Sequence, residues 1–286
     1  MAVESEAEHI KKLIRDLILL PITFILFLFR KRTFADLIQP IRDLWDFFWD
    51  AKATAILILI NVFVYIFILV LVSTNFLGIG DFKAFFHDYM EDGPKNLISL
   101  NFFPIVMNLF THFSFSHLFG NMIFLFVFGR VVEKNIGSKK TILMYLATGI
   151  ISGVFSDIIN LADLAHFEYG ASGAIMGLGM IALLLDPYAF TFFAIGIPTP
   201  IFIWVWVFMA GDIFSIILSE ESSVAYFAHL GGYLSAIALS FFLLPEWRGN
   251  MKKNLVMSFM TILAIYFIWS FNVIPMILSY LGLSIA

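Results

Sequence analysis

Long runs of apolar residues, separated by short polar stretches, dominate this chain. A helix that crosses a membrane needs about 20 such residues. Seven runs approach this length, and they cover residues 53–72, 115–129, 141–161, 172–185, 201–218, 224–244 and 255–281. The second and fourth runs are short, and Pro275 is expected to kink or end the last one. The pattern predicts an all-α polytopic membrane protein with seven spans.

The segment before the first span mixes basic and apolar positions. In residues 10–29 the first apolar side chains share one helical face, with basic residues among them. The uncharged part, residues 17–29, contains Pro21 and is shorter than a span. We therefore predict an amphipathic helix in the membrane interface, followed by aromatic anchors at residues 45–49. The alternative is a short additional span.

A long loop, residues 73–114, separates the first two predicted spans. Loops of this length usually have a function of their own or are disordered. The later part of this loop, residues 97–104, is largely apolar. We therefore expect it to pack into the membrane surface.

Composition supports the membrane assignment and excludes some chemistry. The chain is 61% hydrophobic and 13% charged, whereas soluble domains have about 25% charged residues. It contains no cysteine, which excludes disulfides, thiolate metal sites and a cysteine nucleophile. The acidic N-terminus does not resemble the basic start of a signal peptide. We expect the lipid bilayer and no nucleic acid among its partners, and the oligomeric state stays open.

The distribution of basic residues predicts an orientation. Of the 17 Lys and Arg residues, only Lys83 and Lys95 lie in the loop 73–114, and the others precede the first span or follow the second or sixth. Loops rich in Lys and Arg stay in the cytoplasm. The N-terminus is therefore expected in the cytoplasm and the C-terminus outside, in the cell membrane.

Polar residues near the outer ends of three spans suggest a site. Ser172 begins the fourth span between glycines, and His229 lies near the start of the sixth. His117 and Asn121, four residues apart on one helical face, lie at the start of the second. Polar and ionisable residues at membrane depth are costly and mark functional sites by default. The predicted topology brings all four to a similar depth.

These residue types permit acyl transfer. A serine hydroxyl becomes a strong nucleophile when a base takes its proton, and histidine is the usual base. His117 and Asn121 can donate hydrogen bonds to an oxyanion, as can the N–H groups at the start of the Ser172 helix. Ser172 is therefore a candidate nucleophile and His229 a candidate base.

Small residues would let the two helices approach closely. Gly173 and Gly177 form one small-xxx-small pair, and Gly232 and Ala236 form another on the histidine's helix. Smooth faces of this kind would permit a serine–histidine hydrogen bond. Plain helix packing is the simpler interpretation of Gly173 and Gly177. It is compatible with a role in bringing the serine and the histidine together.

Each candidate also has a structural interpretation. Ser172 alone would more often be a helix N-cap, and His229 alone a hydrogen-bonded core histidine. Asp212, a carboxylate inside the fifth predicted span, would orient a base or, as we prefer, make a structural hydrogen bond. Asp157 and Asn160, near the end of the third span, are expected to be solvated.

A metal site is not expected. His112 and His117 are five residues apart, and no carboxylate or cysteine pattern lies near them. Structural and catalytic zinc sites need such further ligands.

Taken together, the motifs resemble the rhomboid family of intramembrane serine proteases. The resemblance covers residues 53–244. Its motifs are Gly170-Ala171-Ser172-Gly173, His117 and Asn121 preceded by His112, Ala228-His229 followed by Gly232 and Ala236, and a Glu-containing turn expected at residues 129–137.

The resemblance implies a fold and an activity. It implies a six-helix core with Ser172 as nucleophile and His229 as base, without a cofactor. His117, Asn121 and the Ser172 N–H would form the oxyanion hole. Substrates would be transmembrane proteins, cleaved in or near their membrane segments.

The resemblance also implies a domain organisation. Residues 1–52 would be a cytoplasmic amphipathic segment, residues 53–244 the catalytic core, and residues 245–286 a cytoplasmic loop with a C-terminal seventh span.

The chain departs from the family pattern at three places. A Trp-Arg pair is missing from the first loop, where Phe103-Pro104 stands. Met176 replaces an aromatic residue four positions after the serine, and Ala236 stands where glycine is common. The alternative is an inactive rhomboid-like protein that binds transmembrane helices, and the presence of both Ser172 and His229 weighs against it. A transporter is disfavoured because the chain has no internal repeat.

Overall fold

The computed structural model describes residues 11–74, 78–192, 198–218 and 225–270. Six described helices are long and apolar enough to cross a membrane, and a seventh, α10, is shorter. These seven helices are α4 (Lys52–Ser73), α8 (Phe115–Ile136), α9 (Ser138–Ile159), α10 (Ser172–Leu185), α11 (Ile201–Leu218), α12 (Tyr226–Leu243) and α13 (Arg248–Ser270). The prediction of an all-α polytopic membrane protein is confirmed. The expected effect of Pro275 lies outside the described residues.

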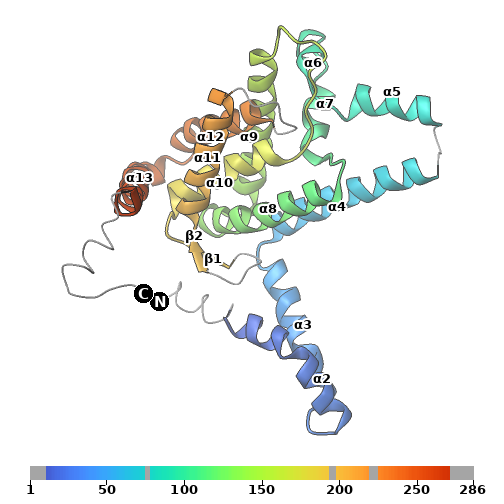
Figure 1. Cartoon of the computed structure of the whole chain (residues 1–286), viewed down its shortest axis with the longest axis vertical. Helices are drawn as coiled ribbons and strands as arrows, with labels where there is room; N and C mark the ends of the chain where they lie inside the picture. Colours follow the sequence, from blue (N-terminus) through green and yellow to red (C-terminus); the bar gives the residue numbers. More distant parts are fainter. Residues whose placement is uncertain (1–10, 75–77, 193–197, 219–224, 271–286) are drawn as a thin grey trace.

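Helix α10 is the centre of the bundle. Every residue from Gly173 to Leu185 is buried, and α8, α9, α11, α12 and α13 pack around it (Figure 1). Its 14 residues extend about 21 Å at 1.5 Å per residue. The hydrocarbon core is about 30 Å thick. At least one end of α10 must therefore lie below a membrane surface, inside the protein.

The second span is longer than the sequence suggested, because two charged residues inside it have hydrogen-bond partners on the segment before α4 or at its start. Arg130 donates to the Phe47 carbonyl oxygen at 2.9 Å and to Asp50 Oδ2 at 2.7 Å. Glu133 accepts from the backbone N–H groups of Ala53 at 2.8 Å and Thr54 at 2.9 Å. These hydrogen bonds compensate the two charges, and they satisfy backbone N–H groups in the first turn of α4 that have no partner within the helix.

The prediction of a turn over residues 129–137 is therefore wrong. This stretch is helical through Ile136, and the chain turns only at Gly137, whose φ is +80°. A positive φ of this size favours glycine.

The N-terminal segment is divided between several helices. The predicted single helix over residues 10–29 is interrupted at Leu19, and α2 (Leu20–Leu28) is apolar on all sides. The amphipathic character continues in α3 (Phe34–Trp49), which begins with a capping box between Thr33 and Asp36. Neither α2 nor α3 is among the described helices long enough to span, so the alternative of an extra span there is not supported.

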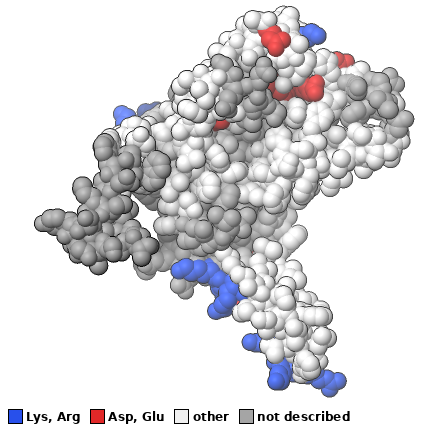
Figure 2. All heavy atoms as spheres, viewed as in Figure 1, with Lys and Arg blue, Asp and Glu red and all other residues white. Residues whose placement is uncertain are grey.

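Charge is distributed unevenly over the molecule. Figure 1 shows α2 and α3 projecting from the helix bundle. In the view of Figure 2, Lys and Arg gather mainly along this projection and at the base of the bundle, and Asp and Glu gather at the opposite end. This agrees with the uneven distribution of Lys and Arg along the sequence.

The described part of the long loop contains four short helical elements. They are α5 (Ile79–Tyr89), α6 (Pro94–Ile98), α7 (Phe102–Met107) and the 3₁₀ turn η1 (Asn108–Phe110), and α6 and α7 pack against α9. Ile98, Leu100, Phe102 and Phe103 are exposed. Exposed apolar residues in a row suit contact with lipid.

Two short strands and a 3₁₀ turn complete the described elements. Strands β1 (Phe190–Phe192) and β2 (Pro198–Pro200) pair antiparallel between α10 and α11. The 3₁₀ turn η2 (Pro245–Trp247) leads into α13.

The first loop also covers the end of α9, so the expectation that Asp157 is solvated is wrong. Backbone bonds between Asp92 and Glu168, 2.9 and 2.7 Å long, tie the loop to the segment before α10. Asp157 is 2% exposed and Asp92 is 1% exposed. The second expected solvated residue, Asn160, is half-buried.

Asp92 gives a prediction for the pH dependence of stability. Burial raises the pKa of its carboxyl from the ordinary value of 3.8 to about 7, with the charge of Glu168 adding to the effect. Because the folded protein holds this proton more tightly than the unfolded chain, stability should fall as pH rises from about 4 through about 7. Asp92→Asn should therefore stabilise the protein at pH 8 by about 2–4 kcal/mol.

Thermal unfolding in detergent at pH 5 and pH 8 measures this. The gain in Tm for Asp92→Asn should be clearly larger at pH 8. Asp88→Asn is the matched control, because Asp88 is an exposed carboxylate in the same loop. An equal change in Tm at both pH values for Asp92→Asn would contradict the prediction.

Candidate active site

Ser172 is the first residue of α10, directly after a glycine turn. Gly170 has φ +120°, a conformation that L-residues rarely adopt, and its N–H donates to the Asn108 carbonyl oxygen at 2.9 Å. The N-cap of α10 is Ala171, and no side chain caps this end. Ser172 therefore does not act as an N-cap. The first N–H groups of α10 have no partner within the helix.

Helices α10 and α12 cross in close contact at two glycines. A Cβ at Gly232 would lie 2.2 Å from the Gly173 carbonyl oxygen and 3.2 Å from the Gly177 nitrogen. A Cβ at Gly173 would lie 3.4 Å from the Ala228 carbonyl oxygen. Only residues without a side chain permit this approach. Ser172 and His229 are the sequence neighbours of this crossing.

The other two small residues named from the sequence are also buried in the bundle. A Cβ at Gly177 would lie 2.6 Å from Thr148 Cβ, so this glycine also packs against α9. Ala236 on α12 is completely buried.

The His229 ring is held from the side of α11. Its Nδ1 lies 3.0 Å from Asp212 Oδ1. The other carboxylate oxygen, Oδ2, accepts from the Tyr233 hydroxyl at 3.0 Å, and this hydroxyl also lies 3.1 Å from Met176 Sδ. A carboxylate accepts and does not donate, so this contact places a proton on Nδ1. Among the described residues, no hydrogen bond joins Ser172 Oγ to this ring.

His117 and Asn121 lie against the turn before Ser172. A Cβ at Gly170 would lie 3.0 Å from His117 Nε2 and 3.6 Å from Asn121 Nδ2. The structure thus brings both side chains from α8 to the start of α10. Both carry N–H groups that can donate to an oxygen developing negative charge at this point.

His112 orients Asn121. The Asn121 amide nitrogen lies 2.8 Å from His112 Nε2. Burial lowers the pKa of His112 to about 4, so the ring is neutral at physiological pH and this nitrogen accepts. One amide N–H of Asn121 is thereby engaged, and the second remains available toward Gly170.

Asp212 and Tyr233 are the residues whose contacts the sequence did not reveal. We expected Asp212 to make a structural hydrogen bond, and the hydrogen bond is present, but its partner is His229. The signal was the carboxylate itself, because a charge in an apolar span requires a partner. Tyr233 lies four residues after His229, on the same helical face.

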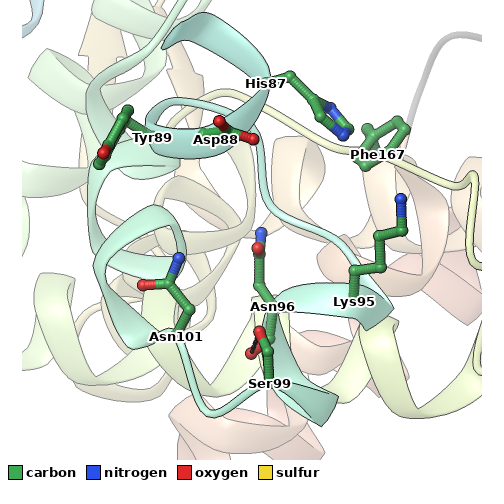
Figure 3. Close-up of a pocket in the computed structure, with 8 residues that line it drawn as sticks. All are labelled: His87, Asp88, Tyr89, Lys95, Asn96, Ser99, Asn101 and Phe167. Atoms are coloured by element: carbon green, nitrogen blue, oxygen red, sulfur yellow. Dashed lines mark hydrogen bonds between the residues drawn. The ribbon is translucent and has the colours of Figure 1, made fainter. Parts of the chain in front are cut away.

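The described residues contain no group of three or more His, Cys, Asp or Glu placed to hold a metal ion. A cavity of about 420 Å³ lies elsewhere, on the first loop (Figure 3). It is lined by His87, Asp88, Tyr89, Lys95, Asn96, Ser99, Asn101 and Phe167, and this lining includes none of the four candidate site residues. It is separate from the candidate active site.

Comparison with known proteins places these residues in a family. The model of the Rhomboid domain matches residues 100–246, more than half of the chain. The chain is 27% identical over 144 residues to RHOMBOID-like protein 12, mitochondrial, of Arabidopsis thaliana, a match that covers 45% of this chain and 42% of the relative. It is 29% identical over 158 residues to the presenilin-associated rhomboid-like protein, mitochondrial, of Rattus norvegicus, covering 52% and 40%.

A bacterial relative gives a shorter match. The chain is 31% identical over 81 residues to the putative rhomboid protease YdcA of Bacillus subtilis, which covers 28% of this chain and 40% of the relative. The matches span about two-fifths of the length of these three relatives. The family model matches more than half of the chain, and the helix bundle brings the helices of Ser172 and His229 into contact. The chain belongs to the rhomboid family.

Proposed function

We propose that this protein is an intramembrane serine endopeptidase that cleaves transmembrane segments of other membrane proteins. The observation that carries the proposal is the crossing of α10 and α12 at Gly173 and Gly232. It puts the helix start that bears Ser172 next to the helix turn that bears His229, whose Nδ1 is already occupied. The name of the Bacillus relative, a putative rhomboid protease, supports the same reaction class.

In the proposed reaction, Ser172 Oγ attacks the carbonyl carbon of the scissile peptide bond while its proton moves to His229 Nε2. The carbonyl π electrons move onto oxygen, which becomes an oxyanion. The C–N bond then breaks, and His229 returns the proton to the departing amine. A water molecule, deprotonated by the same histidine, hydrolyses the acyl-enzyme and regenerates Ser172. No step needs a cofactor.

His117, Asn121 and the Ser172 N–H would stabilise the oxyanion. Loss of one such donor typically lowers kcat by about 10²–10³. His117→Ala and Asn121→Ala are each expected to fall in this range, with cleavage of a transmembrane substrate in detergent as the measurement. His87→Ala, in the separate cavity of the first loop, is the control and should keep wild-type kcat. Full activity in both test variants would remove the oxyanion assignment.

We further propose the orientation and organisation inferred from the charge distribution. Residues 1–52 form a cytoplasmic segment, residues 53–244 the catalytic core, and residues 245–286 a cytoplasmic loop with the last span, in the cell membrane. Because α10 is short, Ser172 would lie below the outer surface, where it meets the transmembrane segment of a substrate. Substrate proteins and lipid are the proposed partners.

A covalent label tests the proposal directly. A fluorophosphonate, which reacts with activated serines, should label the wild-type protein and not Ser172→Ala. Ser114→Ala and Ser152→Ala are matched controls that should keep the label. If the wild type neither takes the label nor cleaves any of a panel of transmembrane substrates, the alternative function, a non-catalytic protein that binds transmembrane helices, replaces the proposal.

A further inference from the structure

We propose that Asp212 is a positioning residue that fixes the tautomer and orientation of His229, so that the site operates with three residues instead of two. The inference rests on the proposed serine peptidase function and deepens it.

Asp212 is placed for this role by its contacts. It is 8% exposed and is the only charged residue of α11, a helix that is otherwise fit for lipid. Its Oδ1 lies 3.0 Å from His229 Nδ1 and its Oδ2 lies 3.0 Å from the Tyr233 hydroxyl. Each carboxylate oxygen therefore has its own donor. The two donors, His229 and Tyr233, lie one turn apart on α12.

A buried carboxylate in this position is costly unless it is paired. Structural carboxylates in spans are normally bound to backbone or to a cation. Here one oxygen is bound to the ring of the candidate base, and the other to a tyrosine that fixes the rotamer of the carboxylate. The arrangement restrains the ring and has no other evident target.

The neighbouring residue Met176 belongs to the same set of contacts. It stands one turn after Ser172, on the face of α10 toward α12, and is a flexible side chain. Its sulfur lies 3.1 Å from the Tyr233 hydroxyl. The carboxylate is the stronger acceptor of the two, so the hydroxyl proton lies toward Asp212.

The chemical consequence concerns the proton. With Nδ1–H bound to Asp212, Nε2 presents a lone pair that can take the Ser172 proton. When it does, the ring becomes an imidazolium, both N–H bonds remain intact, and the carboxylate stays ionised and stabilises the new charge. In the opposite tautomer Nε2 carries the proton and the ring cannot act as the base.

Asp212→Asn tests the inference with little change in volume. The asparagine amide can donate to His229 Nδ1, which moves the proton to Nε2. We expect kcat to fall by about 10²–10⁴, while KM changes by less than about threefold, because the variant alters the chemical step and not binding. Asp212→Glu, which keeps the carboxylate, should recover at least about tenfold of the lost kcat.

Asp157→Asn is the matched control. Asp157 is a second buried carboxylate, on α9, and is 2% exposed. It makes no hydrogen bond with His229 among the described residues, so its loss should leave kcat close to that of the wild type. A fall in kcat equal to that of Asp212→Asn would mean that any buried charge matters equally, and would overturn the inference.

A spectroscopic measurement separates this inference from the proposed function. In protein with ¹⁵N-labelled histidine, the ring signals of His229, assigned by their loss in His229→Gln, should report the Nδ1–H tautomer in the wild type and the Nε2–H tautomer in Asp212→Asn. This readout does not need activity, so it holds even if the wild type fails to cleave. An Nδ1–H ring in Asp212→Asn, or an unchanged kcat with cleavage still dependent on Ser172, would overturn the role of Asp212 and leave the proposed function standing.

Discussion

Ser172→Ala should lower cleavage of a transmembrane substrate by about 10⁴–10⁶, the loss that removal of a nucleophile–base unit usually causes. Its side chain is half-buried and makes no hydrogen bond among the described residues, so the fold should be unaffected, with stability changed by less than about 0.5 kcal/mol. The measurement is single-turnover cleavage in detergent, with Tm taken from the same preparation. Cleavage at the wild-type rate would exclude Ser172 as nucleophile.

The histidine requires a more careful substitution. His229→Ala removes the donor from Asp212 Oδ1 and leaves a buried carboxylate partly unpaired, which typically costs about 3–5 kcal/mol. His229→Gln keeps an N–H donor toward Asp212 but cannot act as a base. Both should reduce cleavage as far as Ser172→Ala does, and His229→Gln should do so with a higher Tm than His229→Ala.

The double variant is the informative control. Because serine and histidine act as one unit, Ser172→Ala with His229→Gln should be no less active than Ser172→Ala alone. Additive losses would show that the two residues contribute independently, and would remove the proposed proton transfer between them.

Sequence patterns predicted the spans because each apolar run is a local property of about 20 residues. They also singled out Ser172 and His229, since polar residues in such runs are rare. They failed where a contact was distant in sequence. The end of α8 was placed too early because the partner of Arg130 is Asp50, 80 residues away, and Glu133 is satisfied by backbone N–H groups of α4.

The same limit applies to the carboxylates. Asp212 and Asp157 both carried the signal of a charge in an apolar stretch, and the sequence could not assign either a neighbour. The structure pairs Asp212 with His229 across 17 positions. It buries Asp157 because the first loop, joined to Glu168 by backbone bonds, folds over α9. Burial by a distant segment has no local pattern.

Gly232→Ala should disrupt the site more than any other single methyl group. The added Cβ would meet the Gly173 carbonyl oxygen at 2.2 Å, and a backbone atom cannot rotate away as a side chain does. Overpacking of this kind usually costs about 1–3 kcal/mol, and here α10 and α12 must separate. A displacement of about 1 Å at a catalytic site can cost about 10² in rate. Lower Tm and at least that loss of kcat are expected.

Gly249→Ala is the matched control, because it adds the same methyl group to a helical glycine. Among the described residues, a Cβ at Gly249 meets nothing within 4 Å, and replacing glycine with alanine in a helix is favourable by roughly 0.5–1 kcal/mol. This variant should therefore keep its activity and gain a little stability. If Gly232→Ala behaved in the same way, α10 and α12 would not be in contact at Gly173. The geometric basis for pairing Ser172 with His229 would then be lost, whatever the activities of Ser172→Ala and His229→Ala.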